Sequence, residues 1–129
     1  MKTHALRYVA IVVLGLMTSI ALAGGDPAKE PVATMAKILL DLNHYPSAKE
    51  KEKLQAIAGD ANNSTAIQTI AMAIHDMEHS VTAEDKGKLQ AIADSTDSSG
   101  EEKELAGILL GITHYPGSEA KERLKKLME

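Results

Sequence analysis

A motif that returns every 35 residues, without insertion or deletion, limits what this chain can fold into more than any other feature. His44, His79 and His114 lie at that interval, and the segment KLQAIA occurs at 53–58 and again at 88–93. A strict period of this length is typical of helical repeats, in which each unit buries its apolar face against the next unit. The period therefore predicts an all-α fold made of three repeated units.

Each unit, at approximately 30–64, 65–99 and 100–129, is expected to be a helix-turn-helix hairpin of two short helices. Apolar residues recur at steps of three and four in the first half of each unit, which is the pattern of a helix with one buried face. The second helix begins with mostly charged residues, and residues that cap helices, such as Ser47 and Ser64, stand just before the expected starts. About six short helices follow from this pattern.

Two arrangements of these helices satisfy the period. They can stack as a short open solenoid or close into a compact helical bundle, and three units do not decide between the two. The period is close to that of tetratricopeptide repeats, but the Trp, Gly, Tyr and Phe positions of that consensus are not present in register. The sequence therefore indicates an architecture and not a family.

The first 23 residues have the pattern of a secretory signal peptide. Lys2 and Arg7 precede an apolar stretch, which closes on the small residues around Ala21 and Ala23. The apolar stretch is short for a membrane-spanning helix, so we expect cleavage after Ala23, with an uncleaved anchor as the alternative. Residues 24–129 are then expected to be a single α-helical domain, exported to the periplasm or the extracellular space and without stable membrane insertion.

The composition of the expected mature chain excludes some classes of partner. Loss of the leader leaves 12 basic residues against 18 acidic ones, a formal charge of −6. Nucleic-acid binding needs clustered Lys and Arg, and single-strand binding also needs stacking aromatic residues, whereas the chain has no Phe or Trp. No cysteine is present, so packing and not disulfides must stabilise the domain. Nucleic acid is therefore not an expected partner.

Three of the four histidines after the leader occupy the same position of the unit, at the end of the first helix or just past it. A hydrogen-bond donor or cation suits the exposed carbonyls at a helix C-terminus, so the simplest interpretation is that His44, His79 and His114 order the turn. The alternative is a ridge of imidazoles along one edge of the stacked helices. Such a ridge could bind a metal ion or make association depend on pH.

The middle unit departs from the pattern at His75, because its counterparts are Leu40 and Leu110. His75 and His79 are four residues apart, so we expect them on one helical face, where two imidazoles can share a zinc, copper or nickel ion if another element supplies a third ligand. The candidate supporting ligands nearby are Met72, Asp76 and Glu78. A half-buried, hydrogen-bonded histidine without a metal is the other interpretation.

No catalytic motif is present, neither a glycine-rich phosphate loop nor a nucleophile elbow nor a reactive cysteine, and so we do not expect an enzyme. The leading hypothesis is a small exported binding or adaptor module for a protein or peptide. Its expected interaction edge consists of His44, Tyr45, His79, His114 and Tyr115.

The alternative hypothesis is a periplasmic metal-binding protein that uses the His75 and His79 pair. Neither hypothesis requires a cofactor, and a divalent transition metal is the single candidate. The oligomeric state is left open by the sequence.

Overall fold

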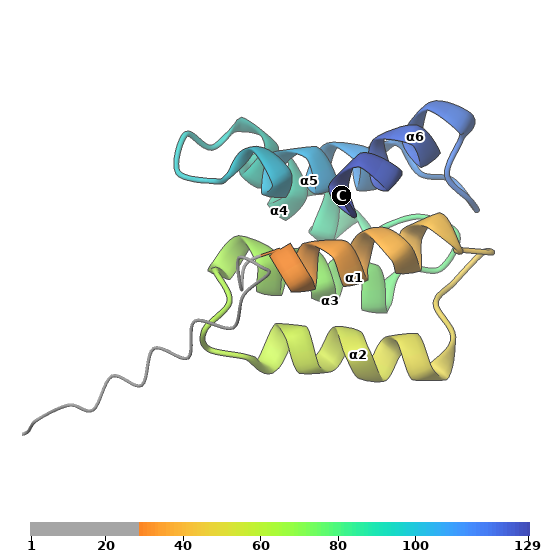
Figure 1. The fold of residues 1–129 in the computed structure, drawn as a ribbon, viewed down its shortest axis with the longest axis horizontal. Helices are drawn as coiled ribbons and strands as arrows, with labels where there is room; N and C mark the ends of the chain where they lie inside the picture. Colours follow the sequence, from red (N-terminus) through yellow and green to blue (C-terminus); the bar gives the residue numbers. More distant parts are fainter. Residues whose placement is uncertain (1–28) are drawn as a thin grey trace, which may run out of the picture.

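The computed structural model describes residues 29–129, and within them it shows six α-helices and no β-strand (Figure 1). The helices are α1 (Lys29–Leu40), α2 (Ala48–Gly59), α3 (Thr65–Asp76), α4 (Ala83–Asp94), α5 (Gly100–Gly111) and α6 (Ser118–Leu127). The prediction of an all-α fold of about six short helices is confirmed. The signal peptide expected at 1–23 lies outside the described residues.

The helix starts follow the 35-residue period because their caps do. Ser47 and Thr82 accept hydrogen bonds from the backbone N–H groups three residues later in α2 and α4, and Ser64 and Ser99 do the same for α3 and α5. Ser47 with Glu50 forms the reciprocal capping box expected from its spacing. The residues that repeat in the sequence thus set the same boundary in successive units.

The six helices close into a ring. The most extensive contacts join α2 to α3, α4 to α5, and α1 to α6, so the first helix packs along the last one (Figure 1). Helices α1, α3 and α5 also contact one another at the centre. The three units are therefore arranged around an approximate threefold axis in a closed bundle, and the open solenoid is not formed.

The helices that pack most closely are not the two helices of one unit. The second helix of each unit packs along the first helix of the next unit, because the short turns at 60–64 and 95–99 place α2 beside α3 and α4 beside α5. The turn inside a unit is longer and partly extended. The two helices of each unit still contact each other, but less extensively than α2 contacts α3 or α4 contacts α5.

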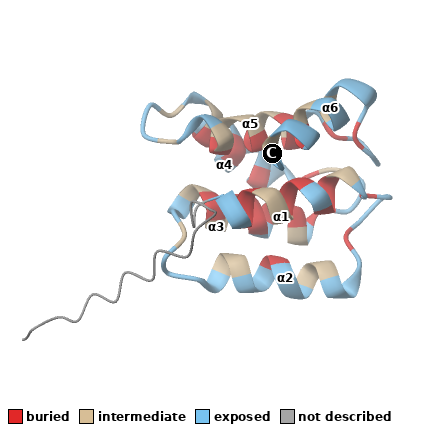
Figure 2. Ribbon diagram, viewed as in Figure 1, coloured by how far each residue is buried: buried red, intermediate tan, exposed pale blue. Residues whose placement is uncertain are grey.

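The core lies on the inner helices. Figure 2 shows the buried residues concentrated on α1, α3 and α5, whereas the outer helices are largely exposed. Each outer helix still inserts one fully buried leucine at the same position of the repeat, namely Leu54 in α2, Leu89 in α4 and Leu124 in α6. These three side chains anchor the outer layer to the core.

The inner helices carry small residues where they face the core. Ala36, Ala71 and Ala106 occupy equivalent positions of α1, α3 and α5 and are fully buried. A methyl side chain at a buried position lets neighbouring helices approach closely, since the interaxial distance depends on the side chains at the contact.

None of the helices in residues 29–129 is long and apolar enough to cross a bilayer.

An ion pair joins α5 to α6. Two nitrogens of the Arg123 guanidinium donate to the two carboxylate oxygens of Glu104, with N···O distances of 2.5 and 2.9 Å. The hydrogen bond from Arg123 holds the pKa of Glu104 below its ordinary value of 4.5. Because both side chains are more than one-third exposed, solvent screening keeps the contribution of this pair to stability small.

Replacement of an anchoring leucine should destabilise the bundle. Leu89→Ala removes a fully buried side chain and is expected to lower the free energy of unfolding by about 2–5 kcal/mol, from lost burial and the cavity left behind. Urea unfolding followed by circular dichroism measures the change. Leu110→Ala, at a half-buried position of α5, is the matched control and should cost less. An equal loss in both variants would contradict the anchoring role.

The ion pair gives a pH-dependent prediction. Because the pKa of Glu104 is lowered in the folded state, its contribution is present above the unfolded-state pKa and is lost as the pH falls through the folded-state pKa. Glu104→Gln is therefore expected to reduce the free energy of unfolding at pH 7 by no more than about 1 kcal/mol. The difference between the variant and the original protein should shrink at about pH 3. A difference that is the same at both pH values would show that the charge is not responsible.

Candidate metal centre

Three turns of the same unusual conformation meet at one end of the bundle. In each turn the residue after the histidine donates its N–H to the carbonyl of the residue before it; these hydrogen bonds join Tyr45 to Asn43, Ser80 to Glu78 and Tyr115 to Thr113, at 3.0, 2.7 and 2.8 Å. The φ angles of His44, His79 and His114 are 72°, 68° and 68°. A hydrogen bond across three residues with positive φ at the centre is the rarer, strained form of γ-turn. The same strain thus occurs three times.

Buried residues on both sides fix each turn. Two residues before the histidine, the chain leaves helical geometry at Leu42, Met77 and Ile112, whose side chains are buried. Two residues after the histidine, Pro46, Val81 and Pro116 are buried as well. The turn therefore does not need proline, since a buried valine occupies the same place in the middle unit. The histidine side chains, held between these two anchors, are left exposed.

The backbones of the three histidines form a closed ring of hydrogen bonds. His44 N–H donates to the carbonyl of His114, His114 N–H donates to that of His79, and His79 N–H donates to that of His44. The N···O distances are 2.9, 2.5 and 3.0 Å in that order. Each histidine is thus both donor and acceptor, and the three turns hold one another in the strained conformation.

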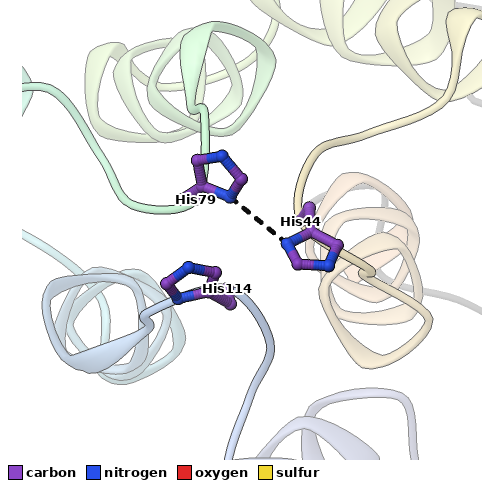
Figure 3. A group of neighbouring side chains, drawn as sticks. All are labelled: His44, His79 and His114. Carbon is purple, nitrogen blue, oxygen red and sulfur yellow. Dashed lines mark hydrogen bonds between the residues drawn. The ribbon is translucent and has the colours of Figure 1, made fainter.

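The three imidazoles converge on a common centre (Figure 3). The ring centroid of His44 lies 5.2 Å from that of His79 and 5.5 Å from that of His114. The centroids of His79 and His114 are 4.8 Å apart. One ring nitrogen from each histidine lies within 4.8 Å of those of the other two. We call His44, His79 and His114 the histidine triad. It contains three exposed nitrogen donors and no carboxylate.

The spacing of these nitrogens is close to that of ligands on one ion. The Nδ1 atoms of His44 and His79 are 3.2 Å apart and share a hydrogen bond, so one of the two carries the proton. Two tetrahedral ligands at about 2.05 Å from a zinc ion lie about 3.3 Å apart. A metal ion can therefore take the place of the shared proton, with rotation of the His114 ring to complete a three-nitrogen set.

The shared helical face that was expected for His75 and His79 is not formed. Helix α3 ends at Asp76 and Met77 has extended backbone, so His79 lies beyond the helix and the two histidines do not share a helical face. Their expected relation was wrong because it required the helix to continue. His75 instead is half-buried, with its Nδ1 atom 2.6 Å from the carboxylate of Asp76.

Of the supporting ligands expected for His75, Asp76 contacts its ring, whereas Met72 and Glu78 are not part of a group of metal-binding side chains. Met72 is exposed on α3, and Glu78 is exposed in the turn before His79. Among residues 29–129, the histidine triad is the one group of three or more His, Cys, Asp or Glu side chains whose ligand atoms lie close enough together to hold a metal ion. His79 is therefore placed with the histidines of the other two turns.

Of the expected interaction edge, the structure brings the three histidines together. The histidine triad is gathered at the axis, but as a triangle and not as the ridge expected from stacked helices. Tyr45 and Tyr115 directly follow two of the three histidines and are 61% and 63% exposed. The third turn has Ser80 in that position. The sequence contained one signal for this triangle, the period itself, because equivalent residues of three units meet if the units close around an axis.

No protein-family model, curated protein or solved structure matched the chain.

The positive φ angle predicts which residues the turn tolerates. His114→Asn should leave the free energy of unfolding nearly unchanged, because asparagine accepts a positive φ, whereas His114→Val should lower it by about 1–3 kcal/mol, because a β-branched side chain does not. Urea unfolding of both variants measures the difference. Equal stability of the valine and asparagine variants would contradict the strained turn.

Proposed function

We propose that this protein is a small exported helical protein that binds one divalent transition-metal ion through His44, His79 and His114. The observation that supports this most strongly is that three exposed imidazoles, one from each unit, bring one ring nitrogen each to within 4.8 Å of the other two. Carbonic-anhydrase-type zinc sites use the same set of three histidine nitrogens. The proposed export rests on the leader pattern at 1–23.

The turn alone does not explain why all three residues are histidine. Glycine adopts a positive φ without strain, and asparagine tolerates it, so either would order the same backbone. The exposed rings gain little burial, and protonated imidazoles at this distance would repel one another. The middle unit has replaced Tyr-Pro by Ser80-Val81 but still has His79. These points favour a role for the imidazoles themselves.

The donor set selects a class of metal. Three neutral nitrogens without a carboxylate suit zinc, copper or nickel, whereas magnesium and calcium require oxygen ligands. For one set of nitrogen ligands, Cu²⁺ binds more tightly than Ni²⁺ or Zn²⁺. The metal that occupies the site in the cell then depends on which ion its compartment supplies.

One observation favours a second function on the same face. Tyr45 and Tyr115 are among the most exposed large apolar side chains of the described chain, and both lie next to the histidine triad. Tyrosine is common at the energetic centres of protein interfaces. An adaptor role for a protein or peptide partner is therefore compatible with metal binding, because the two tyrosines would flank the ion.

Metal titration of the exported protein tests the proposal. After removal of bound metal with a chelator, one equivalent of Zn²⁺, Cu²⁺ or Ni²⁺ should bind per chain in isothermal titration calorimetry. A metal concentration of one hundred times the Kd should stabilise the fold by about 2.7 kcal/mol. The triple variant with His44→Asn, His79→Asn and His114→Asn should remain folded, because asparagine tolerates the turn, but should lose stoichiometric binding.

His75→Asn is the matched control for this titration. It removes the histidine that lies outside the triad and should leave both stoichiometry and affinity unchanged. Unchanged binding in the triple variant would refute the triad as the site. Loss of binding in His75→Asn alone would restore the pairing of His75 with His79.

A further inference from the structure

We infer that the histidine triad is the site of a metal carrier, which passes its ion directly to an acceptor that supplies a metal-binding donor of its own. This inference rests on the proposed metal site. The incoming donor bonds to the metal first, and the histidine–metal bonds break afterwards, one at a time. The oxidation state of the metal does not change, and each released imidazole regains its free lone pair or a proton.

The first observation behind this inference is an incomplete ligand set. The described chain brings three side-chain donors together, whereas zinc and copper complexes of this kind take at least four ligands. Glu78 precedes His79 directly, yet its carboxylate does not belong to the group. On a bound ion, the fourth ligand position would therefore face solvent and take a water molecule, which a donor from another molecule can displace.

The second observation is the absence of groups that would hold the rings. Histidines in tightly held metal sites usually donate their second ring nitrogen to a carboxylate or a carbonyl. Within residues 29–129, the side-chain hydrogen bond found in the triad joins His44 to His79, and no carboxylate accepts from these rings. His75, which does have a carboxylate partner in Asp76, is the histidine outside the triad. The triad rings are thus free to rotate away from the ion in turn.

The third observation is that the backbone under these rings is fixed. The cyclic hydrogen bonds and the buried residues on both sides of each turn keep the three backbones together without an ion. The site can therefore release one ion and bind the next without refolding. Fixed backbones with unsupported rings suit repeated exchange better than permanent storage.

The surroundings of the triad favour transfer over catalysis. A catalytic metal also has an open position, but small substrates are usually enclosed in a pocket. A hollow of about 1090 Å³ in this chain lies elsewhere, between the N-terminal end of α1 and residues such as Ile57 of α2. Beside the triad are two exposed tyrosines, Tyr45 and Tyr115, which offer contact area to the face of an acceptor.

Transfer kinetics test the carrier. The zinc-loaded protein is mixed in a stopped-flow instrument with increasing concentrations of a chromophoric pyridylazo chelator, which has nitrogen donors and reports bound zinc by its absorbance. If the chelator enters the open position before zinc leaves, a tenfold higher chelator concentration should give an about tenfold faster transfer, as for any bimolecular step. His75→Asn should show the same dependence.

The outcomes separate this inference from the proposal beneath it. A transfer rate that does not change with chelator concentration would mean that zinc leaves unaided, and it would overturn the carrier while leaving the metal site intact. Failure to load the protein with zinc, copper or nickel before mixing would refute the metal site itself. A rate that depends on chelator concentration in a variant that lacks all three triad histidines would also overturn the inference, because the ion would be bound elsewhere.

Discussion

The cyclic hydrogen bonds among the backbones of His44, His79 and His114 are the interaction on which the rest of the arrangement depends. Each unit gives one donor and one acceptor, so the set is complete only when all three units meet. This ring requires the two ends of the repeat to come together, and α1 and α6 do pack along each other. The convergence of the imidazoles is therefore a consequence of backbone closure, and the metal site would be built on a structure that exists without the metal.

The closure has a cost in backbone strain. A strained backbone residue costs about 1–3 kcal/mol, and the bundle has three of them, against a typical total stability of about 5–15 kcal/mol for a small domain. Buried neighbours such as Leu42 and Pro46 hold the turns in place, and the apolar core must offset the strain. Glycine would relieve it at each position. The chain has histidine instead in all three turns, so the same three strained residues also bring three imidazoles together.

The sequence predicted those parts of the structure that depend on local signals. The helix starts follow from caps such as Ser47 and Ser64, and the buried faces follow from apolar spacing. The closure could not be predicted in this way, because it depends on the φ angle of a histidine, and histidine is compatible with either sign. The sequence left His79 either at the end of the first helix or just past it, because no proline or glycine follows Asp76, whereas the structure ends α3 at Asp76. Both points concern the turn, where tertiary contacts decide the conformation.

X-ray absorption spectroscopy of the protein loaded with one equivalent of zinc tests whether the histidine triad holds the ion, since it reports the atoms bound to zinc. We expect three imidazole nitrogens at about 2.0–2.1 Å and one further oxygen or nitrogen ligand from solvent or buffer. The spectrum should lose its imidazole scattering when the three triad histidines are replaced by asparagine. A zinc shell dominated by carboxylate oxygens, or three imidazoles that persist in the triple variant, would contradict zinc binding at the histidine triad.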